Sequence, residues 1–376
     1  MSAAMTQHLD FASDNWAGVS PRILDAIAAA NSGGAPAPAY GGDDVTKRMQ
    51  ARFAECFETD VVVIPVPTGT AANGLALEIL ASRDGLILGH EEAHIFTKEA
   101  HARTFFNDRA RIIKLQAIDG RLTPEAVHAT LGGLSPADRG PVRRHAMISL
   151  TNGTECGTVY TPAQVKALSA IAHRHEVAVH MDGARFANAV ASLNCTPAEL
   201  TWKSGVDVLS FGATKNGALG VDAVVVFDPK GRGAAWAKHA HEACDWFGYV
   251  ASKSRFASAQ LDAMIEDGHW LDLARHANAM ADRLAQGLTK IAGVRLAFPR
   301  EINQVFAILP AAVEGAMRAA GGRFHPWDSH ATAPGLAPKD GEKLMRLVAS
   351  FHTSADEVDR LIAAAASVSA SAHAAE

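Results

Sequence analysis

Short apolar runs alternate with helix-like stretches through the first two thirds of the chain. The runs occupy residues 61–66, 84–88, 146–150, 177–181, 206–210 and 223–227. Between them, 161–172 begins with Thr161 and Pro162, a pair that favours the start of a helix. Such alternation is typical of a mostly parallel sheet with helices on both faces, so the sequence predicts an α/β fold.

The pattern changes after Phe227. An amphipathic helix is predicted over 270–291, and two further apolar runs follow at 294–298 and 305–309. A helix followed by a small sheet is an α+β arrangement, distinct from the first part of the chain. The tail, 363–376, is rich in Ala and Ser and is expected to be a fraying helix end.

This change of pattern predicts two unequal domains. We expect a large cofactor-binding domain over 1–240, a connecting region over 241–257 and a smaller C-terminal domain over 258–376. Contact between the N-terminal segment and the small domain is compatible with this division. A chain of 376 residues, 48% hydrophobic, is also long for one domain and able to bury a large core.

Charge and cysteine content exclude several classes of protein. The net charge of −5 leaves no basic stripe of the kind that binds nucleic acid. The four cysteines form no CxxC pair, which argues against a zinc site or a disulfide framework. No apolar run approaches the length of a membrane span, and the first residues do not resemble a secretion signal. We therefore expect a cytoplasmic protein with no metal site and no membrane or nucleic-acid partner.

Candidate chemistry lies just beyond two of the apolar runs. Lys215 follows 206–210 among small and hydroxyl residues, and Asp182 follows 177–181. Neighbouring parallel strands would bring both side chains to one crevice. Pyridoxal phosphate needs such a pair, an amine to hold its aldehyde as a Schiff base and a carboxylate to keep its ring nitrogen protonated. Either residue alone is more often part of an ordinary turn or surface.

A third element strengthens this interpretation. The run 61–66 stops at Pro67, and Thr68, Gly69 and Thr70 then lead into a good helix-forming stretch. Small and hydroxyl residues at a helix N-terminus can cradle a phosphate, although a plain turn with an N-cap threonine is the alternative. Together, the three elements match the phosphate, ring nitrogen and aldehyde of pyridoxal 5′-phosphate.

Several motifs in one order resemble the low-specificity L-threonine aldolases, which are fold-type I pyridoxal phosphate enzymes, with phenylserine aldolase closest in motif wording. The resemblance extends from about Phe11 to the C-terminal helix. The matching motifs are FASDN (11–15), YGGDD (40–44), PTGTA (67–71), HI (94–95), TECGTVY (154–160), MDGARFAN (181–188), SFGATKNG (210–217) and RFASAQ (255–260).

The resemblance implies roles for four further residues. His94 matches the histidine that stacks on the cofactor ring, and otherwise it would be an ordinary surface histidine. Arg185 and Arg346 correspond to arginines near the substrate or cofactor, where a guanidinium suits an α-carboxylate, and Ser13 adds a hydroxyl. The alternatives are a structural ion pair for Arg185 and a surface position before a strand for Arg346.

The implied reaction is retro-aldol cleavage of an L-β-hydroxy-α-amino acid, such as threonine, allo-threonine or phenylserine, to glycine and an aldehyde. Either His94 or a bound water is the base. Another pyridoxal phosphate reaction such as β-elimination, or a non-catalytic structural subunit, is the alternative. Assembly into a homo-dimer or tetramer is also implied. The physiological substrate, the threo or erythro preference and any need for a monovalent cation stay open.

Two segments depart from the family pattern. Residues 243–249 are aromatic and acidic where relatives carry a cationic cluster, so a phosphate contact is lost or supplied elsewhere, for example by Lys253 or Arg255. Trp246 and Tyr249 would then reshape the pocket or pack in a subunit interface. The second segment, 324–338, is longer and richer in proline than usual, and loops of this kind often gate or line sites.

Overall fold

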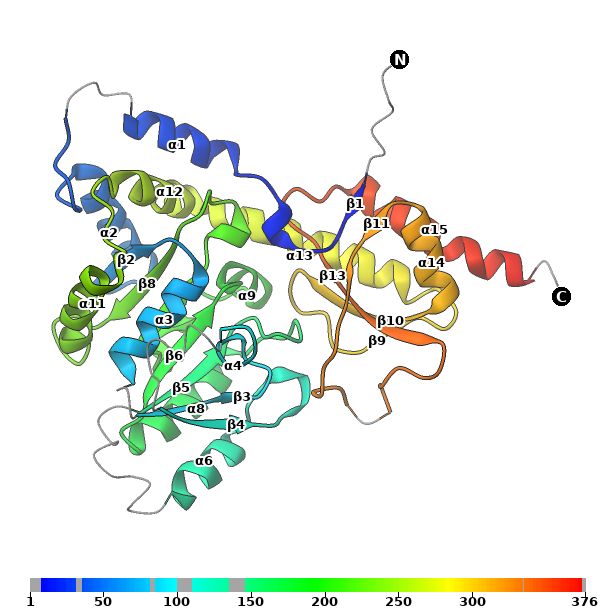
Figure 1. Cartoon of the computed structure of the whole chain (residues 1–376), viewed down its shortest axis with the longest axis horizontal. Helices are drawn as coiled ribbons and strands as arrows, with labels where there is room; N and C mark the ends of the chain where they lie inside the picture. Colours follow the sequence, from blue (N-terminus) through cyan, green and yellow to red (C-terminus); the bar gives the residue numbers. More distant parts are fainter. Residues whose placement is uncertain are drawn as a thin grey trace.

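The computed structural model describes residues 8–31, 36–81, 85–99, 110–134, 146–333 and 335–373. A large lobe holds most of the chain up to α12, and a smaller lobe holds the C-terminal sheet and helices (Figure 1). Asp84, the expected start of one strand, and residues 374–376 of the tail lie outside the described residues.

A seven-stranded sheet forms the centre of the large lobe, in the order β2-β8-β7-β6-β5-β3-β4. Its strands, in chain order, are β2 (Val61–Val66), β3 (Leu86–His90), β4 (Arg111–Leu115), β5 (Ala146–Thr151), β6 (Ala178–Gly183), β7 (Val208–Phe211) and β8 (Asp222–Phe227). Only β8 runs antiparallel to its neighbours, β2 and β7. The predicted mostly parallel α/β fold is confirmed.

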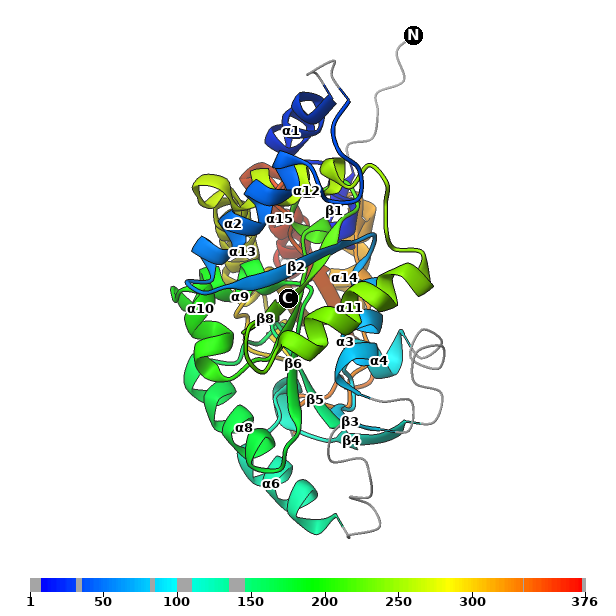
Figure 2. The same ribbon diagram turned by 90° about the vertical axis from the view of Figure 1, so that its left-hand side faces the viewer.

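Both faces of this sheet are buried, which explains why its strands are continuous apolar runs. Successive residues enter opposite cores: Ile148 and Leu209 pack on one face, Met147 and Val208 on the other. Figure 2 shows α8 and α6 on one side of the strands, and α11 and α3 on the other. The helices of this lobe are α2 (Asp44–Cys56), α3 (Gly69–Leu80), α4 (His94–Thr97), α6 (Pro124–Gly133), α8 (Pro162–Arg174), α9 (Phe186–Leu193), α10 (Pro197–Leu200) and α11 (Ala234–Phe247).

The predicted start of α8 is confirmed in detail. Thr161 is the N-cap, and its side chain accepts a hydrogen bond from the backbone N–H of Gln164. The Gln164 side chain accepts in return from the backbone N–H of Thr161 at 2.8 Å, which completes a capping box around Pro162, the first residue of the helix.

The smaller lobe contains a four-stranded antiparallel sheet, in the order β12-β13-β10-β9. Its elements are β9 (Arg295–Leu296), β10 (Gln304–Pro310), α14 (Ala311–Ala319), β12 (His325–Pro326), β13 (Glu342–Val348) and α15 (Ala355–His373). Two helices lead into it, α12 (Arg255–Ile265) and α13 (His269–Leu288). The long helix predicted over 270–291 is therefore present, and it ends slightly earlier.

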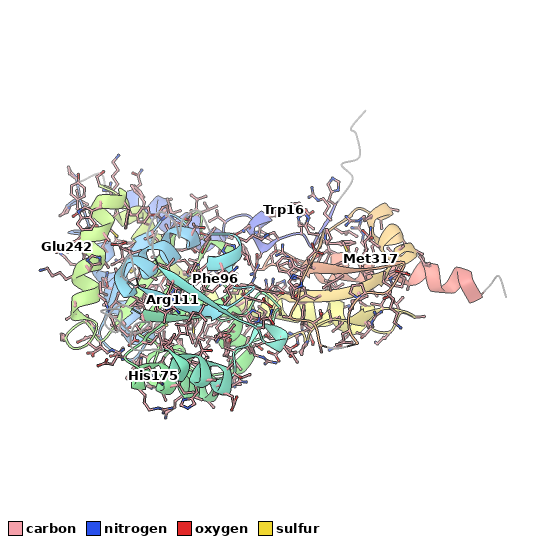
Figure 3. The ribbon with its side chains drawn as sticks, turned by 60° about the horizontal axis from the view of Figure 1, so that its bottom comes forward. Trp16, Phe96, Arg111, His175, Glu242 and Met317 are labelled. Atoms are coloured by element: carbon pink, nitrogen blue, oxygen red, sulfur yellow. The ribbon has the colours of Figure 1, made fainter. Side chains whose placement is uncertain are left out.

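The N-terminal segment connects the two lobes. Strand β1 (Leu9–Asp10) pairs in parallel with β11 (Gly322–Arg323), and Leu9 and Phe11 are fully buried in the core of the smaller lobe. The chain then passes through η1 (Asp14–Trp16) to α1 (Pro21–Asn31), which packs on α12. Figure 3 shows Trp16 between the lobes. The sequence-based domain boundaries themselves stay a prediction.

The remaining short elements are 3₁₀ turns, η2 (Ile118–Gly120), η4 (Trp202–Ser204), η5 (Thr214–Asn216) and η6 (Glu266–Gly268). Within the described ranges, no helix combines the length and apolarity that crossing a bilayer requires. The same ranges contain no group of three or more His, Cys, Asp or Glu side chains suited to a metal ion.

Candidate active site

A cavity of about 500 Å³ lies at the carboxyl ends of the parallel strands, where the two lobes and the N-terminal segment meet. This edge is where open α/β sheets bind ligands. The residues to which the sequence analysis assigns a catalytic, cofactor-binding or substrate-binding role line it: Ser13, Thr68, Gly69, Thr70, His94, Asp182, Arg185, Lys215 and Arg346.

Lys215 lies in η5, the tight turn that follows β7. The turn ends at Gly217, whose φ of 104° is in the left-handed region that glycine adopts readily. The ammonium group is surrounded by protein, and burial, followed by the positive charge of Arg185, lowers its pKa from the ordinary lysine value. A lowered pKa leaves more of the amine in the uncharged form that attacks a carbonyl.

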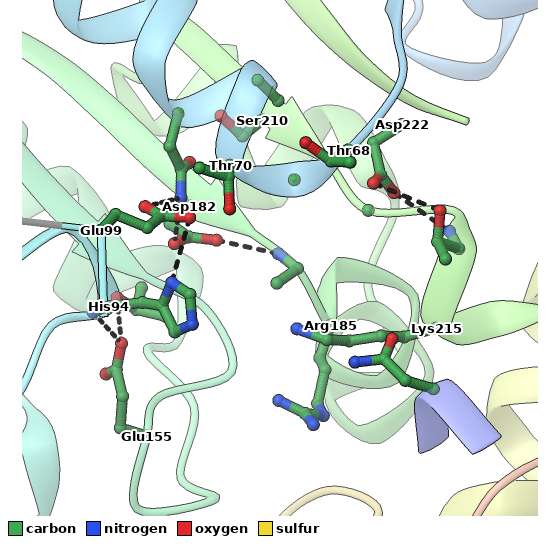
Figure 4. Close-up of a pocket in the computed structure, with 18 of the residues that line it drawn as sticks. Thr68, Thr70, His94, Glu99, Glu155, Asp182, Arg185, Ser210, Lys215 and Asp222 are labelled. Atoms are coloured by element: carbon green, nitrogen blue, oxygen red, sulfur yellow. Dashed lines mark hydrogen bonds and ion pairs between the residues drawn. The ribbon is translucent and has the colours of Figure 1, made fainter. Parts of the chain in front are cut away.

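Asp182 is buried near the end of β6, directly opposite Ser210 of β7. Its Oδ1 accepts a hydrogen bond from the backbone N–H of Ala184 at 3.0 Å. Its Oδ2 accepts from the side-chain amide of Asn73 at 2.9 Å. Figure 4 shows the carboxylate beside the His94 ring, with Lys215 across the cavity from both. The neighbouring strands β6 and β7 thus bring Asp182 and Lys215 to one site, as the sequence predicted.

The first turn of α3 forms the wall expected to bind phosphate. Thr68 is its N-cap and accepts a hydrogen bond from the N–H of Ala71 at 3.0 Å. Gly69 has no side chain, and a Cβ placed on it would approach Asp222 Oδ2 at 3.8 Å. The Asp222 carboxylate is already bound by the backbone N–H groups of Ala213 and Thr214. The turn therefore faces the cavity with no side chain at Gly69 and with the backbone N–H groups of a helix N-terminus.

His94 is the first residue of α4. Its Nδ1 lies 3.1 Å from Glu99 Oε1, and its backbone N–H donates to Glu155 Oε1 at 2.8 Å. The hydrogen bond that His94 donates to Glu99 is the main cause of a raised pKa of the imidazole. Among the described residues, Nε2 has no hydrogen-bond partner.

Three polar residues around His94 were not identified from the sequence. Asn73 Nδ2 donates to Glu99 Oε2 at 3.0 Å, in addition to Asp182. Glu155 Oε1 also accepts from Thr151 Oγ1 at 3.1 Å, whereas Oε2 is buried without a hydrogen-bond partner in the described part of the chain. Burial, followed by the charge of Asp182, raises the pKa of Glu155 to about 7. Glu155 belongs to the TECGTVY motif, and this motif was the one feature of the sequence that could have pointed to it.

Arg185 makes the ion pair that the sequence left open as an alternative. Its guanidinium binds both oxygens of Asp14, at 2.8 and 2.9 Å. Asn303 Nδ2 also donates to Asp14, at 3.0 Å. Burial opposes ionisation of Asp14, but Arg185 and Lys215 together hold its pKa below the ordinary value. Arg185 therefore has a fixed carboxylate partner and still borders the cavity.

Arg346 lies within β13, so the alternative of a surface arginine before a strand is wrong. Its Nη2 makes a long 3.4 Å contact with the carbonyl oxygen of Ala12. Its Nε is buried and has no acceptor in the described structure. Burial, and then the charge of Arg185, lowers its pKa to about 10. An unpaired buried guanidinium N–H beside a cavity is a site for an anionic ligand.

The proline-rich loop over 324–338 contributes Trp327 to the cavity wall. The Trp327 ring lies 4.6 Å from the Arg346 guanidinium. The loop is held against the large lobe by Glu92, whose Oε1 accepts hydrogen bonds from Ser329 Oγ at 2.7 Å and the N–H of His330 at 2.6 Å. The expectation that this loop lines the site is met.

The other departing segment does not reach the cavity within this chain. Residues 243–249 form the end of α11 and the turn after it. Trp246 is 70% exposed, and Tyr249 packs beside Phe247 on the outer face of the lobe. Neither aromatic, nor Lys253 or Arg255, lines the pocket. The hypothesis that Trp246 and Tyr249 reshape the pocket is therefore not supported within one chain.

Comparison with known proteins places this site in a family. The family model of the beta-eliminating lyases matches residues 10–312. A low specificity L-threonine aldolase of Pseudomonas sp. is 40% identical over 85% of this chain and 89% of its own length. Another, from Pseudomonas aeruginosa, is 41% identical over 85% of this chain and 90% of its own.

Solved structures show the same fold. A threonine aldolase of Leishmania major superposes with a TM-score of 0.83 at 24% identity, covering 95% of this chain and 98% of that one. A serine palmitoyltransferase of Sphingomonas wittichii, at 17% identity, superposes with a TM-score of 0.68 over 96% of this chain and 87% of that one. With this fold, and with two relatives of about 40% identity that match nearly end to end, the chain belongs to the beta-eliminating lyases and, among them, to the low-specificity L-threonine aldolases.

Proposed function

We propose that the protein is a pyridoxal 5′-phosphate-dependent lyase that cleaves L-β-hydroxy-α-amino acids to glycine and an aldehyde. The observation that supports this most strongly is the meeting of Lys215, Asp182 and the start of α3 in one cavity. The relatives named L-threonine aldolase point to threonine-type substrates.

The residues of the cavity fit pyridoxal phosphate. The first turn of α3 offers N–H donors and the space beside Gly69 to a phosphate. Asp182 would hold the proton of the ring nitrogen, and Lys215, with its lowered pKa, would hold the aldehyde carbon. His94 would cover the ring. When bound, the cofactor supplies the electron sink for the bond that breaks at Cα.

Arg346 would fix the orientation of the substrate. Its unpaired Nε needs an acceptor, and the α-carboxylate of an amino acid provides one. Ser13, which lines the cavity on the N-terminal side, would add a hydroxyl to this contact, and Arg185, held by Asp14, would lie next to it. A fixed carboxylate determines which bond at Cα stands perpendicular to the cofactor plane.

His94 is the side chain we propose as proton acceptor. Because Nδ1 is engaged by Glu99, Nε2 carries the free lone pair. The proton of the substrate β-hydroxyl would pass to Nε2 while the Cα–Cβ bond breaks and the Cβ–O bond becomes the aldehyde carbonyl. A proton added at Cα then completes glycine. A water bound in the site is the alternative acceptor.

Product analysis tests the proposal. The protein is loaded with pyridoxal phosphate and incubated with L-threonine, L-allo-threonine or L-threo-phenylserine, and glycine and the matching aldehyde are assayed. We expect both products in equal amounts, and neither from Lys215→Ala. A 2-oxo acid with ammonia would instead establish β-elimination. If no product forms and no absorbance of a lysine-bound cofactor appears, a non-catalytic subunit is the better interpretation.

Assembly as a dimer or tetramer and a cytoplasmic location stay predictions.

A further inference from the structure

Glu99 is placed to act on His94 from behind the ring. It lies just after α4 and its side chain is only 5% exposed. One carboxylate oxygen, Oε1, faces His94 Nδ1 at 3.1 Å, and the other, Oε2, accepts from Asn73 at 3.0 Å. Both oxygens are thus occupied on the protein side, so Glu99 is held in one orientation.

Asn73 connects this carboxylate to a second one. It is buried in α3, and its single side-chain nitrogen donates both to Glu99 Oε2 and to Asp182 Oδ2. An amide nitrogen has two hydrogens, and both are used here on carboxylates. The reverse orientation of the amide would set its oxygen against two acceptors, so the orientation is determined by the network. The amide oxygen, Oδ1, is left buried without a partner among the described residues.

The network also determines which nitrogen of His94 carries a proton. An ionised carboxylate can accept hydrogen bonds but cannot donate them. The Nδ1 that faces Glu99 must therefore be the protonated nitrogen of the neutral imidazole. The lone pair is then on Nε2, on the opposite side of the ring from Glu99 (Figure 4). Carboxylate partners of this kind orient an imidazole and increase its basicity.

We infer that Glu99 and Asn73 are positioning residues: Glu99 directs Nε2 of His94 at the reacting β-hydroxyl, and Asn73 keeps that orientation tied to Asp182. The inference rests on the proposed cleavage reaction. Neither residue touches the reacting atoms, so both act through His94 and Asp182. The chain thus links its proton acceptor and the partner of the cofactor nitrogen through one amide group.

The charges around His94 agree with this assignment. Glu99 is the main cause of its raised pKa, Asp182 acts in the same direction, and Lys215 opposes it. Within the described residues, Glu155, which accepts from the backbone N–H of His94, is the remaining ionisable group in contact. With Glu99 replaced by a neutral amide, the pKa of His94 should fall, and the weaker base should accept a proton less readily.

The test compares two glutamate-to-glutamine variants. Glu99→Gln removes the charge beside His94. The matched control, Glu78→Gln, removes a carboxylate of α3 that also faces a histidine, His239 Nε2 at 3.3 Å, but lies outside the cavity. We expect Glu99→Gln to lower kcat roughly 10–100-fold, as loss of an orienting carboxylate does elsewhere, and to move the acid limb of the kcat profile to lower pH. The control should change neither.

A second measurement does not depend on catalysis. The His94 side chain is 43% exposed, so its reaction with diethyl pyrocarbonate can be followed by peptide mass spectrometry in cofactor-free protein. The modification rate against pH reports the imidazole pKa. This midpoint should lie lower in Glu99→Gln than in the parent, and it should be unchanged in Glu78→Gln. An unchanged His94 midpoint together with an unchanged kcat profile would overturn the inference.

The outcomes separate the inference from the proposed function. If the parent forms no glycine and aldehyde, the function is wrong, while the His94 midpoint still tests the Glu99–His94 link. If the parent is active and Glu99→Gln behaves like the control, only the inference is wrong.

Should circular dichroism show that Glu99→Gln does not fold, Glu99→Asp is measured in its place. Aspartate keeps the charge but holds it farther from His94, so kcat and the His94 midpoint should again fall. Asn73→Ala should weaken cofactor binding and lower kcat, because Asp182 loses a hydrogen-bond donor.

Discussion

Several buried polar atoms around the cavity lack a partner in the described part of the molecule. Arg346 Nε and Trp327 Nε1 have hydrogens to donate, and Glu155 Oε2 and Gln304 Oε1 can accept. Folded proteins rarely leave such atoms unsatisfied, because each costs about 1–3 kcal/mol. A ligand with both donors and acceptors, such as an amino acid, would satisfy them.

Arg346→Lys should weaken substrate binding more than it slows the chemical step. A lysine ammonium cannot reproduce the flat fork of donors or the stacking on Trp327, so we expect KM to rise about 10–100-fold. Steady-state kinetics with threonine measure this. Arg295→Lys is the control, since Arg295 pairs with Glu342 outside the cavity. Equal KM values for the two variants would contradict the role of Arg346.

Glu155→Gln should remove part of the pH dependence of stability. The carboxyl pKa is raised from 4.5 to about 7, so the folded state keeps a proton that the unfolded state has lost. The contribution of Glu155 to the free energy of unfolding is therefore largest below pH 4.5 and declines as the pH rises towards 7. Above pH 7 the free energy of unfolding is lower by up to about 3 kcal/mol on account of this group. Urea unfolding of cofactor-free protein at pH 5 and pH 8 should show a smaller difference for the variant. Identical differences would argue against the raised pKa.

The sequence could identify those site residues that stand next to recognisable local signals. Lys215 and Asp182 each follow an apolar run, and Thr68 marks a strand-to-helix turn. Glu99 and Asn73 carry no such signal. Their importance comes from the approach of α3, α4 and β6 in space, which spacing along one chain does not determine.

At the level of single elements, α3 supports the site at two points. Its N-terminus forms the wall that we propose binds phosphate, and Asn73, one turn further, reaches Asp182. The helix is buried over most of its length, so both points are fixed by the same packing. In the proposed function, one helix would therefore set both the position of the phosphate and the position of the ring nitrogen.

Thr68→Ala should affect both stability and cofactor binding. Loss of an N-cap costs about 1 kcal/mol, and the cradle loses a hydroxyl. Thr161→Ala, which removes the N-cap of α8, should lower the free energy of unfolding by a similar amount without weakening cofactor binding. Urea unfolding and fluorescence titration with pyridoxal phosphate separate the two effects. If both variants bind the cofactor as tightly as the parent, Thr68 has no part in the cradle.

Element prediction from the sequence succeeded where burial produced long apolar runs. It missed β4, because this short edge strand carries two exposed cations, Arg111 and Lys114, and has no continuous apolar run. It also placed the start of β7 two residues early, at Val206, which is buried but lies outside the strand. Apolar patterning reports burial, and strand ends depend on hydrogen bonding that patterning does not reveal.

At the scale of the whole molecule, the cavity exists only because two lobes and a loop meet. Glu92, which follows β3, binds the loop that carries Trp327. Its carboxylate accepts from three successive residues, Ser329, His330 and Ala331. The wall beside Arg346 therefore depends on one side chain of the opposite lobe.

Glu92→Ala should release this loop. Three donors would lose their acceptor, so we expect faster proteolysis within 327–333 and a raised KM, with lysine-bound cofactor retained. Limited proteolysis followed by mass spectrometry measures the first effect. Glu91→Ala is the control, because in the described part of the chain the Glu91 carboxylate accepts a single, exposed hydrogen bond from Gln116. Equal cleavage of both variants would show that Glu92 does not hold the loop.

The pairing of β1 with β11 has a consequence for how the protein is made. Leu9 and Phe11 leave the ribosome long before Phe324, Leu347 and Leu361, which belong to the same core. During synthesis, the side chains of Leu9 and Phe11 must therefore wait for these later segments before they are covered. The large sheet can form in that interval. Closure of the cavity by the smaller lobe is therefore a late event in the life of each newly made molecule.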